Sequence, residues 1–219
     1  MRVSNVIDGD TLALAEGRKL RLIGIDTPEL GRDGAPDEPF ARAARAEVRR
    51  FLGGRSADVR VLPGIEPEDR HRRLLAHVFD GGGRNLSEHL LRQGLAYQVT
   101  VPPNERLSDC YQGAESEARR LMRGLWRFPP LEAADLPKDL QGFRRIAGRA
   151  GAVAKGKGAT RIDLDGALTL RIANADLHRF DRALLAEIPG RRVEVRGWVY
   201  RHHGRPQLRL RHQSSLRVD

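Results

Sequence analysis

The sequence contains one cysteine, Cys110, among its 219 residues, and only 5% of the residues are aromatic. A single cysteine excludes an intrachain disulfide and a zinc site built from several thiolates. No run of about 18 apolar residues occurs, which excludes a membrane-spanning helix of the usual length. Because aromatic residues are scarce, we expect cores made mainly of Leu, Val, Ala and Ile.

The N-terminal residues lack the features of a signal peptide, because Asp8 and Asp10 interrupt any apolar stretch. They lead directly into a strand-like segment, so the sequence is also compatible with an upstream leader that has been removed. The chain itself therefore assigns no compartment. Secretion or export to a periplasm is the expectation if such a leader exists.

Lysine is also scarce, with 4 Lys against 35 Arg, and the net charge is +10. Residues 1–140 hold 22 basic and 22 acidic side chains, whereas residues 141–219 hold 17 basic and 7 acidic side chains. The whole positive excess therefore belongs to the last 79 residues. This asymmetry predicts two parts with different electrostatic roles.

The first part has short apolar segments separated by Gly- and Asp-containing turns, which is typical of strands in a small barrel. A helical pattern over 39–52 lies between the third and fourth of these strands, and two more helical stretches follow the fifth. The expected strands are 3–7, 11–15, 20–25, 59–62 and 75–79, and the later helices are 86–92 and 110–122. The fold class is therefore mainly β with helices, a five-stranded barrel with three helices.

Three prolines lie within 128–140, which we interpret as a linker between domain 1–127 and domain 141–219. The second domain repeats the order of five strands with a helix after the third. This is the pattern of the oligonucleotide/oligosaccharide-binding (OB) barrel. The expected strands are 146–155, 161–164, 168–173, 193–200 and 207–211, with a helix over 176–187. We therefore expect a second, small OB-like barrel.

Candidate chemistry is concentrated in three segments of the first domain: 8–11, 21–29 and 69–76. Taken singly, each has a simpler explanation, namely a solvated turn, a strand with a surface arginine, and a basic surface. Together they supply hard oxygen ligands in Asp10, Asp26 and Glu29, which suit Ca²⁺ or Mg²⁺. Arg21 and Arg73 add guanidinium groups that can bind a phosphate bidentately. This combination suits phosphoryl chemistry, with Glu29 available to activate a water.

Five segments in this order resemble the staphylococcal nuclease (thermonuclease) family over residues 3–127. They are Val-Ile-Asp-Gly-Asp-Thr-Leu (6–12), Arg-Leu-Ile-Gly-Ile-Asp-Thr-Pro-Glu (21–29), Arg-Leu-Leu-Ala (73–76), Leu-Leu-Arg-Gln-Gly-Leu-Ala (90–96) and Gly-Leu-Trp (124–126). The resemblance implies a Ca²⁺-dependent nuclease that hydrolyses phosphodiester bonds of DNA and RNA. It further implies cleavage of the P–O5′ bond, which leaves 3′-phosphate ends.

The resemblance also assigns roles by motif position. Asp10 and Asp26 match the carboxylates that bind one calcium ion, and Thr27 matches the residue that offers its backbone carbonyl. Glu29 matches the general base or water-positioning residue, and the match leaves open which of the two it is. Arg21 and Arg73 match the two arginines that bind the phosphate.

The chain departs from the family pattern where a nucleotide base would pack. Val99 and Val101 stand in place of two tyrosines, and His71 stands in place of the tyrosine that precedes the second catalytic arginine by two residues. Base stacking is therefore expected to be weaker, or to come from Tyr97 or His71. The family's substrate preference therefore cannot be transferred to this chain. We expect a nucleic-acid partner, with single-stranded DNA or RNA favoured.

The last two strands of the second domain are rich in arginine and suggest a groove that follows a nucleic-acid backbone. Trp198, Tyr200 and His202 are each two residues apart, so they could form a stacking platform for bases. The alternative is that Trp198 is a core residue. The candidate contacts are Arg196, Trp198, Tyr200, Arg209 and Arg211. A merely solvated basic surface is the simpler explanation of this charge.

The leading hypothesis is a two-domain nuclease whose second domain assists nucleic-acid binding. One alternative is a non-catalytic nucleic-acid-binding or scaffold protein on the same fold, and the intact set of catalytic positions argues against it. Another makes the second domain a protein-interaction module. Neither the natural substrate nor the oligomeric state follows from the sequence.

Overall fold

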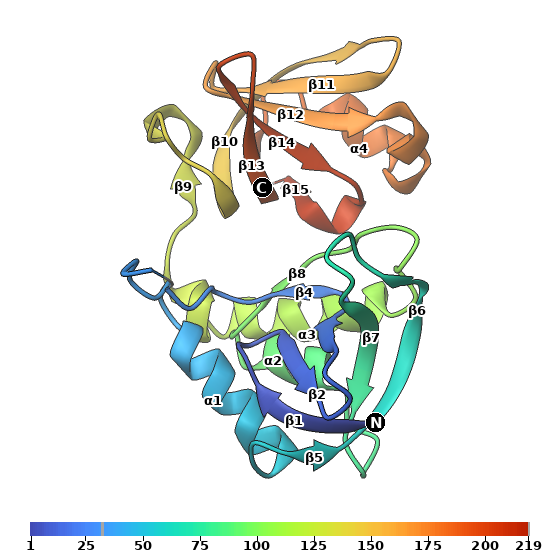
Figure 1. Cartoon of the computed structure of the whole chain (residues 1–219). Helices are drawn as coiled ribbons and strands as arrows, with labels where there is room; N and C mark the ends of the chain where they lie inside the picture. The colour runs from blue at the N-terminus through green and yellow to red at the C-terminus, as the bar shows by residue number, and fades with distance from the viewer. Residues whose placement is uncertain (32, 219) are drawn as a thin grey trace. The chain divides into compact units, whose positions relative to one another are not determined.

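A computed structural model describes residues 1–31 and 33–218 of the chain. Arg32, in the turn-rich stretch before the first helix, and Asp219, the last residue of the expected second domain, lie outside these residues. The chain divides into two compact units, Met1–Phe128 and Pro129–Asp219 (Figure 1). Within the described ranges, we find no helix with the length and apolar character needed to cross a membrane.

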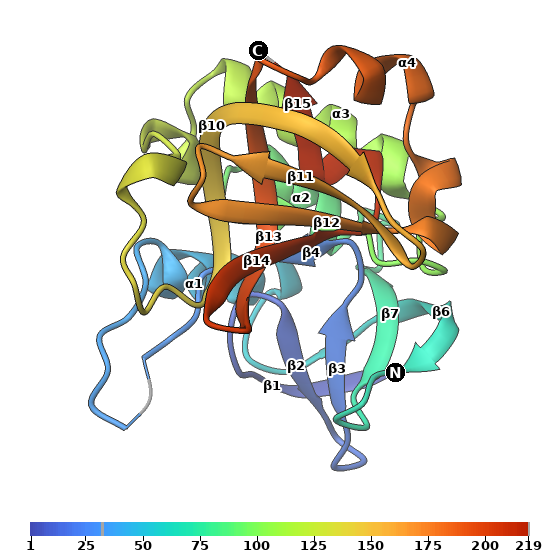
Figure 2. The same ribbon diagram turned by 90° about the horizontal axis from the view of Figure 1, so that it is seen from above.

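The first unit is a curled sheet with three helices. Its strands lie in the order β5-β1-β2-β3-β7-β6, with β3 and β7 parallel. Figure 2 shows β2, β3 and β7 side by side. The elements are β1 (Arg2–Val6), β2 (Thr11–Leu14), β3 (Lys19–Leu22), β4 (Ile25–Asp26), α1 (Ala41–Leu52), β5 (Ala57–Asp58), β6 (Arg60–Glu68), β7 (Leu74–Phe79), α2 (Leu86–Arg92), β8 (Tyr97–Gln98) and α3 (Ser108–Arg120).

The expected strand over 20–25 is divided in two, because β3 ends at Leu22 and β4 begins at Ile25. Gly24 lies between them with a φ of 86°. A Cβ atom on Gly24 would lie 2.2 Å from a ring carbon of Tyr111, so only glycine permits this approach. The break releases residues 25–26 from the large sheet, and they pair instead with β8.

The second unit is a closed barrel of five strands in the order β10-β11-β12-β14-β13, and β13 pairs back onto β10. An α-helix, α4 (Arg182–Glu187), lies between β12 and β13 in the chain, as the sequence predicts. The strands are β10 (Gly142–Lys155), β11 (Ala159–Leu164), β12 (Leu168–Ala173), β13 (Arg192–His202), β14 (Arg205–Leu210) and the added β15 (Leu216–Val218). The mainly β fold class predicted from the strand pattern is therefore confirmed. The second unit is a closed five-stranded barrel, whereas the first is a curled sheet whose outer strands β5 and β6 do not pair with each other among the described residues.

Part of the stretch expected to be a linker belongs to the second unit. Strand β9 (Leu131–Glu132) pairs in parallel with Ile146 and Ala147 of β10. Ala133, which follows it, is fully buried in the core of this unit. Three prolines in a short stretch favour an irregular linker when only neighbouring residues are considered. The pairing of β9 with the distant strand β10 makes part of the stretch a strand instead.

A buried polar pair lies in the core of the first unit, where His77 of β7 meets Tyr111 of α3. The His77 Nδ1 lies 2.7 Å from the Tyr111 hydroxyl, which also donates to Asn85 Oδ1 at 3.3 Å. Burial lowers the pKa of His77 from 6.5 to about 4, with Arg106 contributing repulsion. His77 is therefore neutral in the folded protein at pH 7.

This low pKa predicts an acid-sensitive fold. Between pH 6.5 and about 4 the unfolded chain binds a proton that folded His77 excludes, so the free energy of unfolding decreases by up to about 1.4 kcal/mol per pH unit. His77→Gln, which cannot titrate, should show a smaller loss between pH 7 and 5 in urea denaturation. His203→Gln, at an exposed hairpin tip, is the matched control and should behave as the wild type; equal losses in both variants would contradict the prediction.

Candidate active site

The first component of the site is the tight turn between β1 and β2. The backbone N–H of Asp10 donates to Asp8 Oδ1 at 3.1 Å, so Asp8 closes the turn. A Cβ atom on Gly9 would lie 2.7 Å from Thr27 Oγ1, so the turn packs directly against the residue that follows β4. Asp10 and Thr27 are thereby brought together from distant parts of the sequence.

The buried carboxylate of Asp10 is fixed by hydrogen bonds from three directions. Its Oδ2 accepts from the backbone N–H of Thr27 at 2.9 Å and from the Thr27 hydroxyl at 3.0 Å. Its Oδ1 accepts from the Thr11 hydroxyl at 3.1 Å and pairs with the Arg21 guanidinium. Asp10 is only 1% exposed, so its orientation is set by the fold rather than by solvent.

Arg21 of β3 holds two carboxylates together. Its guanidinium pairs with Asp10 and, through Nη2, with Asp26 Oδ1 at 2.6 Å. The side chain of Arg21 is 12% exposed and that of Asp26 is 9% exposed. One cation and two acidic groups therefore share a largely buried position where β3, β4 and the β1–β2 turn meet.

The pKa of Asp26 is raised from 3.8 to about 6. Burial is the main cause, repulsion by Glu29 and Glu38 adds to it, and the charge and hydrogen bond of Arg21 oppose it. Burial therefore outweighs the favourable effect of Arg21 on the ionised form of Asp26. A further cation beside Asp26 would favour its ionised form.

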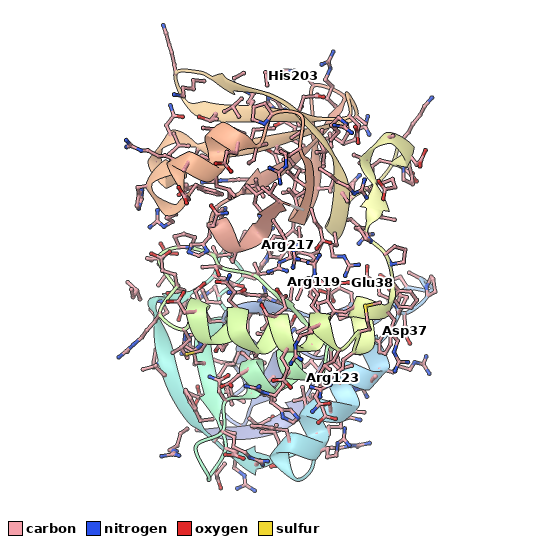
Figure 3. All side chains as sticks on the ribbon, turned by 180° about the vertical axis from the view of Figure 1, so that it is seen from behind. Asp37, Glu38, Arg119, Arg123, His203 and Arg217 are labelled. Carbon is pink, nitrogen blue, oxygen red and sulfur yellow. The ribbon has the colours of Figure 1, made fainter. Side chains whose placement is uncertain are left out.

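Glu29 lies at the exposed rim of this region, at the base of the loop that leads to α1. Its backbone N–H donates to Glu38 Oε2 at 3.0 Å, and its carbonyl accepts from the Glu38 backbone N–H at 3.0 Å. These two hydrogen bonds close the loop at its base, and Figure 3 labels Glu38 beside Asp37. Glu29 is thus anchored through its backbone near Asp26.

Arg73 directly precedes β7, the strand that pairs in parallel with β3. Arg21 lies opposite Leu75, so the alternation of side chains along β7 places Arg73 and Leu75 on the same face of the sheet as Arg21. Arg73 is held by Asp69, whose Oδ2 accepts from Arg73 Nε at 2.7 Å. Asp69 Oδ1 accepts from the backbone N–H groups of His71 and Arg73, at 2.8 and 2.9 Å.

Asp69 is the site residue to which sequence reasoning assigns no role. Its hydrogen bonds from His71 and Arg73 lower its pKa despite the opposing effect of partial burial, so it stays ionised. The sequence signal would be an aspartate followed by its partners two and four residues later, here His71 and Arg73. This is the spacing of a local turn motif. A short aspartate turn is so common in loops that this signal alone does not single out Asp69.

The donor set around Arg21 fits a divalent cation such as Ca²⁺. Asp10, Asp26 and the Thr27 carbonyl are hard oxygen donors, and two ionised carboxylates share the single positive charge of Arg21. Among the residues described, no group of three or more His, Cys, Asp or Glu side chains is arranged to hold a metal. A cation here would therefore be held by two carboxylates and backbone oxygen, with Glu29 nearby.

The residues expected to contact a base differ in their surroundings. His71 is exposed on the turn that also carries Arg73, and its Nε2 accepts from Arg70 Nε at 3.0 Å. Tyr97 pairs with Asp26 across β8 and β4, and its ring meets Trp126 edge to face with centroids 5.4 Å apart. Val99 is buried. His71 is therefore the more accessible of the two ring side chains.

The candidate contacts of the second unit do not form a uniform surface. Trp198 is 46% exposed, so it is not a core residue, and its ring meets Phe143 at 5.2 Å. Tyr200 donates from its hydroxyl to Gln207 Oε1 at 3.1 Å. Arg196 is buried and donates to the Ser214 carbonyl at 2.8 Å, which gives it a structural role.

The other two candidate arginines lie at β14. Arg209 Nη2 donates to Asp176 Oδ2 at 3.0 Å, and its side chain remains 37% exposed. Arg211 is half-buried and follows the end of β14, which stops at Leu210 rather than continuing to 211. Arg209 is thus the one of this pair that lies on the sheet.

Comparison with known proteins gives a consistent result for the first unit. The family model described as "Staphylococcal nuclease homologue" matches residues 19–128. A protein named "Thermonuclease" from Staphylococcus intermedius is 32% identical over 127 residues, which cover 57% of this chain and 74% of that protein.

Two further relatives carry related names. An "Uncharacterized endonuclease" from Escherichia coli O157:H7 is 29% identical over 128 residues, covering 57% of this chain and 75% of that protein. A "Probable endonuclease lcl3" from Penicillium rubens is 31% identical over 121 residues, covering 49% of this chain and 40% of that protein. The family model lies within the first unit, and each of these three alignments covers 57% of the chain or less.

Proposed function

The chain belongs to the staphylococcal nuclease homologue family, and from this premise we propose that its first unit is a Ca²⁺-dependent nuclease acting on DNA and RNA. We propose further that it cleaves the P–O5′ bond to leave 3′-phosphate ends, and that the second unit assists nucleic-acid binding. The observation that carries the proposal is the pairing of Arg21 with both buried carboxylates, Asp10 and Asp26. Single-stranded substrates are favoured because their phosphates and bases are both accessible.

In this proposal each residue has a distinct task. Asp10, Asp26 and the Thr27 carbonyl would hold the calcium ion, which supplies positive charge to polarise the phosphate. Arg21 and Arg73 bind the non-bridging phosphate oxygens and stabilise the charge that develops on them. Glu29, exposed at the rim, accepts a proton from the attacking water or orients it.

The direct test is hydrolysis of single-stranded DNA and of RNA by the full chain, with and without Ca²⁺. We expect calcium-dependent cleavage that Glu29→Gln largely abolishes, and 3′-phosphate ends on the products. Glu16→Gln, which removes an exposed carboxylate from the β2–β3 turn, is the control and should cleave normally. No cleavage above the Glu29→Gln level would instead support a non-catalytic binding protein on the nuclease fold.

The hydrogen bond between Asp69 and Arg73 leads to a separate prediction. In it, Asp69 is a positioning residue that holds the Arg73 guanidinium in place. Asp69→Asn keeps the side-chain shape but weakens the bond to Arg73 Nε, so kcat should fall by about 10- to 100-fold through misplacement of the guanidinium. In an Arg73→Gln background the same change should have little further effect, because the group being positioned is gone.

The chain supplies a matched control for this prediction. Asp80 accepts from the backbone N–H and Nε of Arg84 at 2.9 and 2.7 Å, which repeats the Asp69–Arg73 arrangement just beyond the other end of β7. Asp80→Asn should therefore leave kcat unchanged. Equal losses in the two aspartate variants would mean that turn stability, not the placement of Arg73, explains the effect.

A further inference from the structure

The outer face of the second barrel carries a row of arginines that runs across the strands. Strand pairing places Arg161 of β11 opposite Arg171 of β12, and Arg171 opposite Arg209 of β14. Their neighbours in the chain are buried in the core: Ile162, Leu170 and Leu208. Because side chains alternate along a strand, all three arginines point away from the core, separated by about 4.8 Å from strand to strand.

The row ends in a pair of aromatic rings. Val199 of β13 pairs with Leu208 of β14, and Trp198 and Arg209 are the residues just beyond this last pair of the two strands. Trp198 in turn lies opposite Phe143 of β10, and the two rings meet edge to face with an interplanar angle of 76°. Phe143 supports the Trp198 ring, which is 46% exposed and offers a face to a ligand.

Negative charge near the row is limited. Asp176 is an acidic residue that pairs with the row, because its Oδ2 lies 3.0 Å from Arg209 Nη2. Its Oδ1 also lies 3.6 Å from Arg179 Nη1. Within the described part of the chain, neither Arg161 nor Arg171 has a carboxylate partner. The row therefore presents a net positive charge, in the half of the sequence that holds the whole excess of the protein.

We propose that this row is a binding site for a single-stranded nucleic acid that crosses the strands, with phosphates on the arginines and a base stacked on Trp198. Arginine forks match phosphate oxygens, and an exposed indole stacks on any base. A duplex hides the faces of its bases, so the aromatic end of the row specifies a single strand. The inference rests on the proposed function only in taking nucleic acid as the substrate.

The site differs from the arginine-rich last two strands that the sequence suggests. Arg196 is turned to a structural contact with the Ser214 carbonyl, whereas Arg161 and Arg171 come from earlier strands. Only the register of β11, β12 and β14 shows that these arginines are neighbours. His203, at the tip of the β13–β14 hairpin, marks the far end of the two strands that carry Trp198 and Arg209 (Figure 3).

The test uses the full chain carrying Glu29→Gln, so that the nucleic-acid probe is not cleaved. Binding of a labelled deoxythymidine oligonucleotide of 12 nucleotides is measured by fluorescence anisotropy. The dissociation constant is measured over a range of KCl concentrations. Arg161→Gln and Arg171→Gln should each lower the slope of log affinity against log salt by about 0.7, which is about fivefold weaker binding at 0.1 M salt. Arg182→Gln, an exposed arginine on α4, removes the same charge away from the row and should leave the slope unchanged.

Trp198→Ala should weaken binding by about 5- to 100-fold at every salt concentration without changing the slope, because stacking does not release counterions. Trp198→Phe keeps an aromatic face and should retain most of the affinity. If the row variants bind as Arg182→Gln does, the row is not the site. An unchanged affinity in Trp198→Ala would overturn the single-strand assignment, and polyglutamate competing as well as unlabelled oligonucleotide would point to an acidic protein partner.

This outcome is separable from the proposed function. Binding is measured without turnover, so a wild-type chain that fails to hydrolyse nucleic acid would defeat the nuclease proposal and leave the binding result standing. Conversely, normal hydrolysis with no effect of the row variants on affinity would overturn this inference alone.

Discussion

Replacing Arg73 by Gln should reduce kcat on single-stranded DNA by about 10²- to 10³-fold, with little change in the free energy of unfolding. The expected loss is that of one donor aimed at the developing charge of a transition state. Arg73 is partly exposed and held by Asp69 rather than buried in the core, so its removal leaves no large cavity. The effect is measured as kcat and KM under calcium saturation, with urea denaturation in parallel.

Arg72 is the matched control for this variant. It is adjacent in the chain, carries the same charge and is exposed on the same turn. Arg72→Gln should leave kcat within about twofold, because a surface charge of this kind contributes little to a specific transition state. Similar losses in Arg72→Gln and Arg73→Gln would show that general positive charge near the turn, not one positioned guanidinium, explains the effect.

Replacing Arg21 by Gln should lower the free energy of unfolding, and added Ca²⁺ should restore part of it. Without the Arg21 guanidinium, the buried carboxylates of Asp10 and Asp26 have no positively charged side chain between them. This loss should lower the free energy of unfolding by about 3–5 kcal/mol. Added Ca²⁺ should recover part of this loss if it binds the same carboxylates, because a ligand that binds only the folded state stabilises it. Thermal and urea unfolding with and without Ca²⁺ measure both effects.

Arg18→Gln provides the comparison for Arg21→Gln. Arg18 pairs with Glu68 at 2.6 Å, but both side chains are more than 40% exposed, so losing this pair should cost less than about 1 kcal/mol. If the two arginine variants unfold at the same urea concentration, the pairing of Asp10 and Asp26 with Arg21 does not stabilise the fold as described.

The strands of both units are accessible from the sequence because strand signals are local. Apolar residues alternate with polar ones along 161–164 and 168–172, and both segments lie in strands whose apolar side chains at these positions are buried. Asn85 precedes an expected helix and does cap it, accepting a hydrogen bond from the Glu88 backbone N–H at 2.9 Å. Patterns of this kind depend only on neighbours within one turn or one strand.

The features that the sequence does not predict depend on contacts between distant residues. The break at Gly24 exists because Tyr111 occupies the space beside it, and no pattern near residue 24 reports on α3. Arg196 has the spacing of an outward-facing strand residue, yet a contact with the segment after β14 buries it. For the candidate site, the motif order brings Asp10, Arg21 and Asp26 into one proposal, whereas the support from Asp69 emerges only from the geometry.

The return pairing of β13 onto β10 has a consequence for shortened forms of the protein. Gly142 pairs with Val199, so the second barrel cannot close until nearly all of its sequence is present. A fragment that ends within α4 would leave the backbone groups of β10 and β12 without their partners, and such edges recruit strands from other molecules. Fragment boundaries at the junction of the two units avoid this aggregation hazard, whereas boundaries between α4 and β14 create it.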